Sequence, residues 1–271
     1  MEGAVTALRC RTSDRTADSS RGAEELARAV GDRLGVEPRL VGTLGELRAQ
    51  DWADDLRAAR GCLLEAGGQV DDALSAGAFP VLTAGHCTIA LATLPTVMRH
   101  RPDAKVLWLD AHGDFNTPQT TPSGFLGGMP LAGACGAWDA GLSEDGAVDP
   151  AHVVLCGVRD LDEGERALLE RSPATVIGPT LETLVALQNA LDGAPTYVHL
   201  DCDVLDPEFM PAEFPAPGGL TEEKLYDLLD AVADAGEIVG LEVTALHAPD
   251  QAPRVAGLIE PLLPKDANGL D

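Results

Sequence analysis

The sequence predicts an α/β protein with a mostly parallel sheet of about eight strands and helices on both of its faces. Three observations indicate this fold. Short apolar runs rich in β-branched residues alternate with amphipathic segments along the chain, as in strands joined by crossover helices. The apolar runs are nearly continuous, as expected for strands buried on both faces. Finally, two of the runs lead directly into long loops rich in Pro and Gly, and open α/β sheets carry their sites in such loops.

Each predicted element follows from this alternation in chain order. The strands are expected at residues 4–10, 38–42, 79–85, 105–110, 152–157, 174–178, 196–201 and 237–243. The amphipathic segments between them predict helices at residues 24–34, 51–67, 163–172 and 222–236. No internal repeat, low-complexity tract or linker stands out, so we expect a single domain over residues 1–271.

Charge and composition restrict the partners of the protein. The 271 residues carry a formal net charge of −25, which argues against nucleic acid or an anionic membrane as a partner. The charge suits a cationic substrate or bound metal, although an acidic surface explains it equally well. Without a leader sequence or a long apolar run, we expect a cytoplasmic protein. Six scattered cysteines without a disulfide-like spacing are expected to be reduced: Cys10, Cys62, Cys87, Cys135, Cys156 and Cys202.

Two clusters of metal-seeking side chains follow the predicted strands KVLWL and YVHL. The clusters are Asp110, His112 and Asp114, and Asp201 and Asp203. Alternate residues of a strand share a face, so each cluster is expected to point one way. Four carboxylates and an imidazole at one place require a cation. Oxygen ligands with a single imidazole favour Mn²⁺ or Mg²⁺ over structural Zn²⁺, and bridging carboxylates suggest two ions that activate a shared water.

The order of motifs along the chain extends this interpretation. The motifs are AGHCT (84–88), DAHGDFNTP (110–118), SGFLGGMP (123–130), GVRDLDEGE (157–165), LDCDVLDP (200–207), GGLT (218–221) and LEV (241–243). Together they resemble the arginase, or ureohydrolase, family over most of the chain. The resemblance implies a three-layer α/β/α sandwich, a binuclear manganese site, and hydrolysis of a guanidinium group to a urea and an amine.

The resemblance also implies roles for the clustered residues. Asp110 and Asp201 would bridge the two ions, and Asp114 would complete one shell and hydrogen-bond the bridging hydroxide that attacks the guanidine carbon. His112 and Asp203 would complete the other shell. Glu242 would face the guanidinium of the substrate.

The motif GVRDLDEGE resembles the arginase form, which implies an α-amino acid that carries a guanidine. Asp162 and Glu165 would then approach the α-amino group, while Asn116 and Ser123 would bind the α-carboxylate. A structural alternative stays open for Asp162 and Glu165, because an acid followed three residues later by Glu is also a helix capping box.

Two positions depart from the arginase pattern. Cys87 stands where the family has a histidine ligand, and it is either a thiolate ligand or a small buried thiol. Gly127 stands where arginases carry a histidine that shuttles protons, and Phe125 replaces a polar residue near the substrate carboxylate. A glycine cannot carry a proton on a side chain. His247 is a possible substitute, whereas His199 is expected to be a packed core histidine.

These departures favour a substrate that depends less on a proton shuttle. A hydroxyl on the terminal nitrogen lowers the basicity of the guanidine and makes its carbon easier to attack. We therefore expect hydrolysis of Nω-hydroxy-L-arginine to L-ornithine and hydroxyurea, similar to the hydroxyarginine-hydrolysing branch of the family found in D-cycloserine biosynthesis. The alternatives are an arginase and a non-catalytic metal-binding relative. The short segment after the last helix-like stretch favours a monomer over a trimer.

Overall fold

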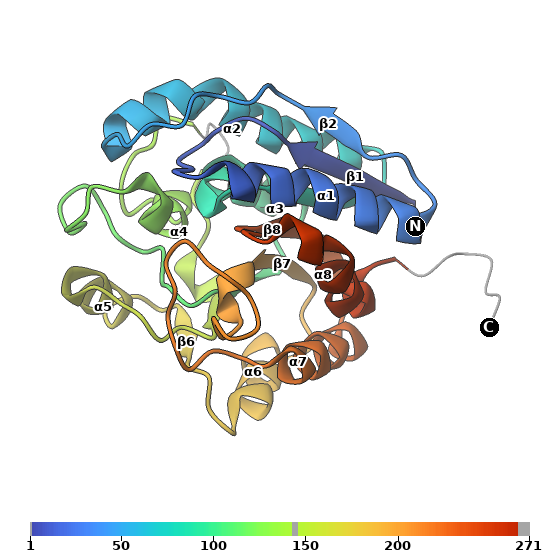
Figure 1. Ribbon diagram of the computed structural model, residues 1–271. Helices are drawn as coiled ribbons and strands as arrows, with labels where there is room; N and C mark the ends of the chain where they lie inside the picture. The colour runs from blue at the N-terminus through green and yellow to red at the C-terminus, as the bar shows by residue number, and fades with distance from the viewer. Residues whose placement is uncertain (1, 143–145, 265–271) are drawn as a thin grey trace.

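The structure is a computed structural model that describes residues 2–142 and 146–264. Its centre is one parallel sheet of eight strands in the order β2-β1-β3-β8-β7-β4-β5-β6 (Figure 1). The strands are β1 (Gly3–Leu8), β2 (Arg39–Val41), β3 (Phe79–Ala84), β4 (Lys105–Leu109), β5 (Val153–Cys156), β6 (Thr175–Ile177), β7 (Thr196–Asp201) and β8 (Ile238–Thr244). All eight predicted strands are confirmed.

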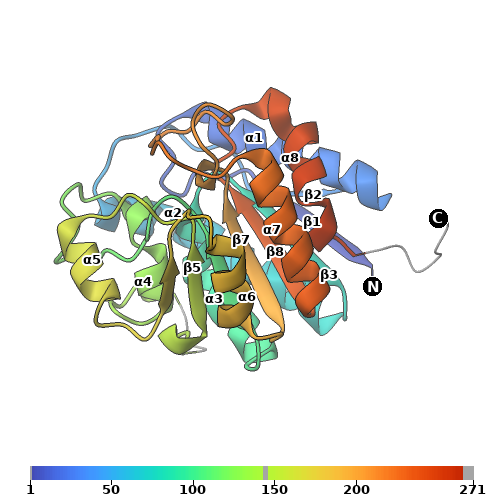
Figure 2. The same ribbon diagram turned by 90° about the horizontal axis from the view of Figure 1, so that it is seen from below.

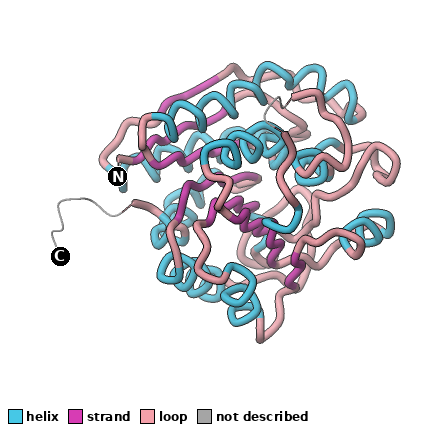
Figure 3. Tube along the Cα trace, turned by 180° about the vertical axis from the view of Figure 1, so that it is seen from behind, coloured by secondary structure: helices cyan, strands magenta, loops and turns pink. Residues whose placement is uncertain are grey.

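Helices cover both faces of the sheet and complete a three-layer sandwich. One core lies against α1 (Ala17–Leu34), α6 (Thr183–Leu191), α7 (Glu222–Ala235) and α8 (Ala252–Leu258). The other core lies against α2 (Trp52–Ser75), α3 (Ala90–His100), α4 (Pro130–Ala134) and α5 (Glu163–Leu169). Figure 2 shows α6 and α7 in front of the strands, and Figure 3 shows helices on both sides of the central strands.

The helices differ from the prediction where amphipathicity is a poor guide. Helix α1 begins at Ala17 and α2 continues to Ser75, so both are longer than expected. Helix α3 was not predicted, because its first eight residues are all buried and leave no polar stripe to recognise. The short helices α4 and α8 have five and seven residues, too few for a clear period.

The register of the four central strands brings their carboxyl ends together. Ala84 of β3 and Asp201 of β7 each pair with Thr244 of β8, and Leu200 pairs with Leu109 at the end of β4. The segments that leave these strands carry the metal-seeking residues of the sequence. The sheet therefore places these segments at one edge, where open parallel sheets place their sites.

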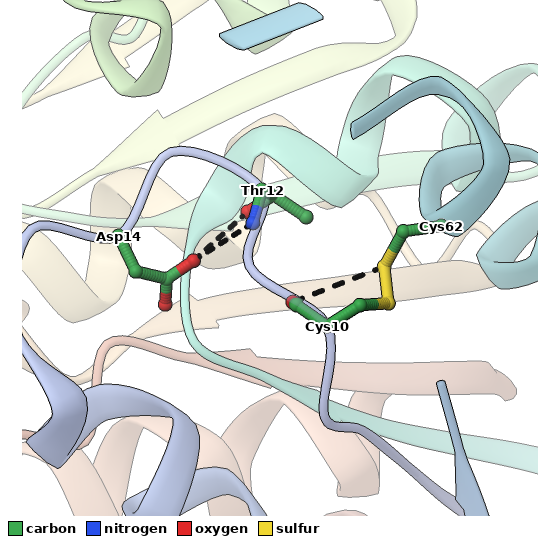
Figure 4. The surroundings of a disulfide bond; sticks show 4 residues. All are labelled: Cys10, Thr12, Asp14 and Cys62. Carbon is green, nitrogen blue, oxygen red and sulfur yellow. Dashed lines mark hydrogen bonds between the residues drawn. A yellow bond between two sulfur atoms is a disulfide. The ribbon is translucent and has the colours of Figure 1, made fainter. Parts of the chain in front are cut away.

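A disulfide joins Cys10 to Cys62, with a Cα–Cα distance of 6.1 Å (Figure 4). The expectation that all six cysteines are reduced is therefore wrong for this pair. Sequence spacing could not reveal it, because the pairing depends on how α2 packs beside the loop after β1. The same loop is held by an ion pair of 2.7 Å between Arg11 and Asp55, and the carboxylate of Asp14 accepts a hydrogen bond from the Thr12 N–H.

No described helix is long and apolar enough to cross a membrane. The other four cysteines are free thiols.

We predict that loss of the Cys10–Cys62 disulfide lowers the free energy of unfolding by about 2–4 kcal/mol, because the bond restricts the unfolded chain. Urea unfolding of the Cys10→Ser/Cys62→Ser variant measures this. A reductant should lower the stability of the wild type by a similar amount and leave the double variant unchanged. Equal sensitivity of both proteins to the reductant would contradict the prediction.

Candidate metal centre

Four buried carboxylates meet at the carboxyl edge of the central strands. Asp110, Asp114, Asp201 and Asp203 are each at most 6% exposed, and His112 lies beside them. The sequence correctly predicted that these side chains meet. Strand alternation is not the reason, because β4 ends at Leu109 and Asp203 lies in a short 3₁₀ turn after β7. The segment after β4 is irregular, and Asp114 has a left-handed backbone with φ 48°, which non-glycine residues adopt only where the surroundings enforce it.

His112 stands between the two strand ends. Its Nδ1 lies 3.4 Å from Oδ1 of Asp110 and 3.1 Å from Oδ2 of Asp203. Backbone N–H groups fix the carboxylates, since Asp110 accepts from His112 N at 2.7 Å and Asp201 accepts from Asp203 N at 2.8 Å. A further bond of 3.0 Å comes from the indole of Trp108 to Asp110. The donor atoms are therefore held in place by the chain itself.

The electrostatics of this cluster call for a cation. Burial, followed by repulsion from neighbouring carboxylates, raises the pKa of Asp110, Asp114 and Asp201. Burial opposes protonation of His112. The contacts of His112 with Asp110 and Asp203 outweigh the effect of burial and raise the pKa of His112 to about 12. Protons thus partly neutralise the cluster. Carboxylates with an imidazole are also a ligand set for hard divalent ions, so the residues present fit a metal.

Cys87 belongs to this cluster. Its Sγ lies 2.8 Å from Oδ2 of Asp201 and 3.0 Å from Oγ1 of Thr244. Burial and nearby carboxylates raise the pKa of the thiol well above its usual value. A cation at this place would act in the opposite direction and favour the thiolate. The thiol lies within the cluster, and its burial suits both a thiolate ligand and a small buried thiol.

Glu242 contacts two other side chains of the sheet. Its carboxylate is fully buried and binds the Tyr197 hydroxyl at 3.0 Å and Nδ1 of His199 at 2.6 Å. The cavity is lined instead by Ala245, the residue that follows the end of β8. The structure shows Glu242 in contact with Tyr197 and His199, and its contact with a guanidinium stays a prediction.

His199 is a buried core residue, as expected. Its ring stacks on Trp108 with 3.5 Å between ring centroids. The Nε2 atom, however, has no hydrogen-bond partner among the described residues. His199, Cys87 and Asp110 offer ligand atoms within 4.8 Å of one another. The sequence did not predict that His199 lies this close to the metal-seeking cluster.

A cavity of about 260 Å³ opens from the carboxylate cluster to the surface. The expected substrate-binding residues Asn116, Ser123, Asp162 and Glu165 line it, together with His112, Asp110, Asp114, Asp201 and Asp203. The Asn116 amide donates to Oδ2 of Asp162 at 2.9 Å, which fixes one polar corner. Ser123 Oγ accepts from the Phe125 N–H at 3.2 Å.

Glu165 has a structural role, because its carboxylate binds two backbone segments. Its two carboxylate oxygens accept from the backbone N–H groups of Phe115 at 2.8 Å and Asp162 at 3.2 Å. The capping-box alternative from the sequence is thus present. Burial raises the pKa of Glu165 to about 7 against these two hydrogen bonds. Glu165 therefore anchors the segment that carries Asp114 and Asn116.

The space beside Gly127 is already filled. A Cβ atom at this position would lie 2.4 Å from Cε1 of His86 and 2.4 Å from Cε1 of Phe125. The two rings pack edge to face, with centroids 5.0 Å apart. A histidine at residue 127 would therefore require both rings to move. The presence of glycine here thus affects the packing of the cavity as well as proton transfer.

Sequence reasoning missed several residues around the cavity. Arg15 and Glu213 line it, and the Arg15 guanidinium lies 4.4 Å from the centre of the Phe125 ring. Arg159 lies outside the lining but donates to the carbonyls of Asp203 and Ala216, both at 2.8 Å. The Pro- and Gly-rich composition of residues 205–220 marked the loop of Glu213 as a site loop, but nothing in its composition identified the residue.

A carboxylate-rich centre at the carboxyl edge of an open parallel α/β sheet is suited to hold divalent metal ions. A profile of the arginase family matches residues 13–255. The N(omega)-hydroxy-L-arginine amidinohydrolase of Streptomyces lavendulae is 38% identical over 261 residues, which cover 96% of this chain and 94% of that one. The arginase of Bacillus caldovelox is 36% identical over 194 residues, 66% of this chain and 64% of that one.

The crystal structure of the Bacillus caldovelox arginase has a TM-score of 0.80 and 26% identity, covering 98% of this chain and 99% of that chain. The chain belongs to the arginase family. The resemblance found in the sequence is thereby confirmed, and the chain is a hydrolase of the class that acts on linear amidines.

We predict that the metal-free protein loses stability as the pH rises above about 4. Because the native pKa values of Asp114 and Asp201 are raised, the native state binds more protons than the unfolded state above that pH, and its stability falls. A bound cation removes this penalty. The increase in Tm on addition of MnCl₂ to EDTA-treated protein should be larger at pH 8 than at pH 5.5.

The matched control for the pH prediction is the Asp201→Asn variant. In this variant, the Tm of the metal-free protein should fall less as the pH rises, and it should increase less on addition of MnCl₂. A metal-free wild type whose Tm rises between pH 5.5 and 8, or a Tm that ignores MnCl₂, would contradict the assignment.

We further predict that Gly127→Ala lowers the free energy of unfolding by about 1–3 kcal/mol, as overpacking does in a filled site. Gly128→Ala is the control, since a Cβ there meets no atom within 4 Å. Urea unfolding of both variants provides the comparison. If the two variants are equally stable, the His86 and Phe125 rings move aside without lowering the free energy of unfolding.

Proposed function

We propose that the protein hydrolyses Nω-hydroxy-L-arginine to L-ornithine and hydroxyurea, with two Mn²⁺ ions as cofactor. The observation that carries this proposal is the combination of Cys87 in the carboxylate cluster with a filled space at Gly127. The site keeps metal-seeking residues and a polar corner for an amino acid, but it has no side chain at residue 127 to carry a proton. An easier guanidine substrate suits such a site.

The cofactor proposal rests on the donor set. Asp110, His112, Asp114, Asp201 and Asp203 would hold the ions, and the Cys87 thiolate would complete the shell near Asp201. When bound, the ions would supply Lewis-acid activation of a water molecule. A sulfur ligand would make one position softer than the other and more tolerant of zinc, cobalt or iron.

The residues of the chain itself would bind and orient the amino acid. The Asp162 carboxylate, held by Asn116, would accept hydrogen bonds from the α-amino group, and Ser123 would donate to the α-carboxylate. Phe125 and Phe214, whose ring centroids lie 5.1 Å apart, would shield the methylene chain from water.

The proton for the leaving ornithine would come by a different route from that in an arginase. Residue 127 has no side chain to carry a proton, and His86, which occupies its space, has its pKa lowered to about 4 by burial. His86 is therefore mostly neutral near pH 7. We propose that solvent or the N-hydroxyl group of the substrate supplies the proton to the leaving ornithine.

The wider role follows from the products. Release of hydroxyurea fits a biosynthetic enzyme of the kind found in D-cycloserine production, and similarity to a hydroxyarginine amidinohydrolase supports this assignment. We propose a cytoplasmic monomer, in which the free substrate reaches the cavity without a partner chain.

The deciding measurement compares kcat/KM for Nω-hydroxy-L-arginine and L-arginine on the Mn²⁺-loaded protein. We predict at least about a tenfold preference for the hydroxylated substrate, with hydroxyurea and ornithine formed in equal amounts. A preference for L-arginine would instead identify an arginase. Bound metal with no turnover of any guanidine would identify a non-catalytic relative.

A further inference from the structure

His199 has one unsatisfied ring nitrogen in the core of the protein. Its side chain is fully buried, and Nε2 has no hydrogen-bond partner among the described residues. A buried polar atom without a partner is costly, and native structures retain few of them. The Nε2 atom therefore points to a ligand that the protein binds at this place.

The other contacts of His199 hold its ring in one orientation. Nδ1 lies 2.6 Å from Oε1 of Glu242, and the ring stacks on Trp108 with an interplanar angle of 2°. Both partners are neighbours in the sheet, because His199 pairs with Trp108 on β4 and with Glu242 on β8.

The bond to Glu242 determines which nitrogen of His199 is free. An ionised carboxylate can only accept, so Nδ1 carries the proton and Nε2 of the neutral ring has a free lone pair. Histidines that bind a metal through one nitrogen usually donate the other N–H to a carboxylate or carbonyl oxygen. Glu242 and His199 therefore have the arrangement of a metal ligand and the group that orients it.

Other donor atoms of the metal-seeking cluster lie close to this histidine. A ring nitrogen of His199, Sγ of Cys87 and a carboxylate oxygen of Asp110 lie within 4.8 Å of one another, and all three residues are buried. Sγ of Cys87 also lies 2.8 Å from Oδ2 of Asp201. Nitrogen, sulfur and oxygen donors are thus gathered at one place.

A second group of donor atoms shares Asp110 with the first. Ligand atoms of Asp110, His112 and Asp203 also lie within 4.8 Å of one another, and these three residues line the cavity. The two oxygens of one carboxylate can bind different ions in a two-metal site. The two donor groups therefore suit two ions that meet at Asp110, and the first group includes the buried imidazole of His199.

We propose that His199 is a metal ligand and that its Nε2 atom binds the same ion as Cys87 and Asp110. The inference rests on the proposed two-ion cofactor, and it leaves the other expected ligands unchanged. Thiolate and imidazole donors suit zinc, cobalt and iron better than carboxylates do. The ion at His199 should therefore be exchanged for Co²⁺ or Zn²⁺ more readily than the ion at His112.

Glu242 can still bind a substrate in this arrangement. Its Oε1 accepts from His199, and its Oε2 accepts from the Tyr197 hydroxyl at 3.0 Å. Each carboxylate oxygen can accept more than one hydrogen bond. A metal on His199 is therefore compatible with the predicted contact between Glu242 and a guanidinium.

Proton NMR of the Co²⁺-loaded wild type tests whether His199 binds metal. A ligated imidazole holds its N–H proton close to the paramagnetic ion, which shifts the resonance outside the normal spectral range. We expect such a resonance from Nδ1–H of His199. It should exchange slowly in D₂O, because the ring is fully buried.

The His199→Asn variant assigns this resonance, because asparagine keeps an amide donor for Glu242 and removes Nε2. The variant should lose the shifted resonance, and calorimetry should show that it binds one of two Co²⁺ ions at least about 100-fold more weakly than the wild type. His152→Asn is the matched control, since His152 precedes β5 at the opposite edge of the sheet. It should resemble the wild type in both measurements.

A Co²⁺-loaded wild type without a shifted, slowly exchanging imidazole N–H would overturn the inference, and this measurement does not depend on the folding of a variant. The inference is also overturned if His199→Asn keeps the resonance or binds both ions as tightly as the wild type. A wild type that binds no ion would overturn the two-ion cofactor as well. Neither measurement involves turnover, so a metal-loaded protein that hydrolyses no guanidine would refute the proposed hydrolysis alone.

Discussion

The structure depends on the repulsion among carboxylates buried at the end of the sheet. Strands β3, β8, β7 and β4 are neighbours in the sheet, and the segments that follow β4 and β7 bring the acids together. Backbone N–H groups, the Trp108 indole and His112 hold individual oxygens, but they do not supply enough positive charge for the whole cluster. The fold therefore concentrates negative charge that a bound divalent cation would neutralise, beside a cavity that opens to the surface.

The sequence predicted the sheet and the metal-seeking cluster well because both leave strong local signals. Buried strands are continuous apolar runs, and acids at their ends are conspicuous. Helix α3 escaped notice because complete burial removes the polar stripe that reveals a helix. The Cys10–Cys62 bond and the placement of Glu242 depend on packing between distant segments, for which the local sequence holds no signal. Motif order therefore located Glu242 on the right strand but could not show that His199 and Tyr197 bind its carboxylate.

The cavity combines two different kinds of wall. One wall is formed by the segment after β4 and the start of α5, where Asn116 donates to the Asp162 carboxylate and Glu165 accepts from the backbone N–H groups of Phe115 and Asp162. The opposite wall is formed by the loop between β7 and α7, held by Arg159 and closed over His112 by Phe214. Two segments that are far apart in the sequence therefore meet at this cavity, and under the proposed function both would contact the substrate.

The packing of His86 and Phe125 against Gly127 has a consequence for how this activity could change over generations. A side chain at residue 127 requires changes at both His86 and Phe125, because a Cβ there would lie 2.4 Å from each ring. If the proposed substrate preference holds, steric packing around Gly127 would help to maintain it. A proton-carrying side chain at residue 127 therefore needs coordinated changes at three positions, and the packing around Gly127 couples them.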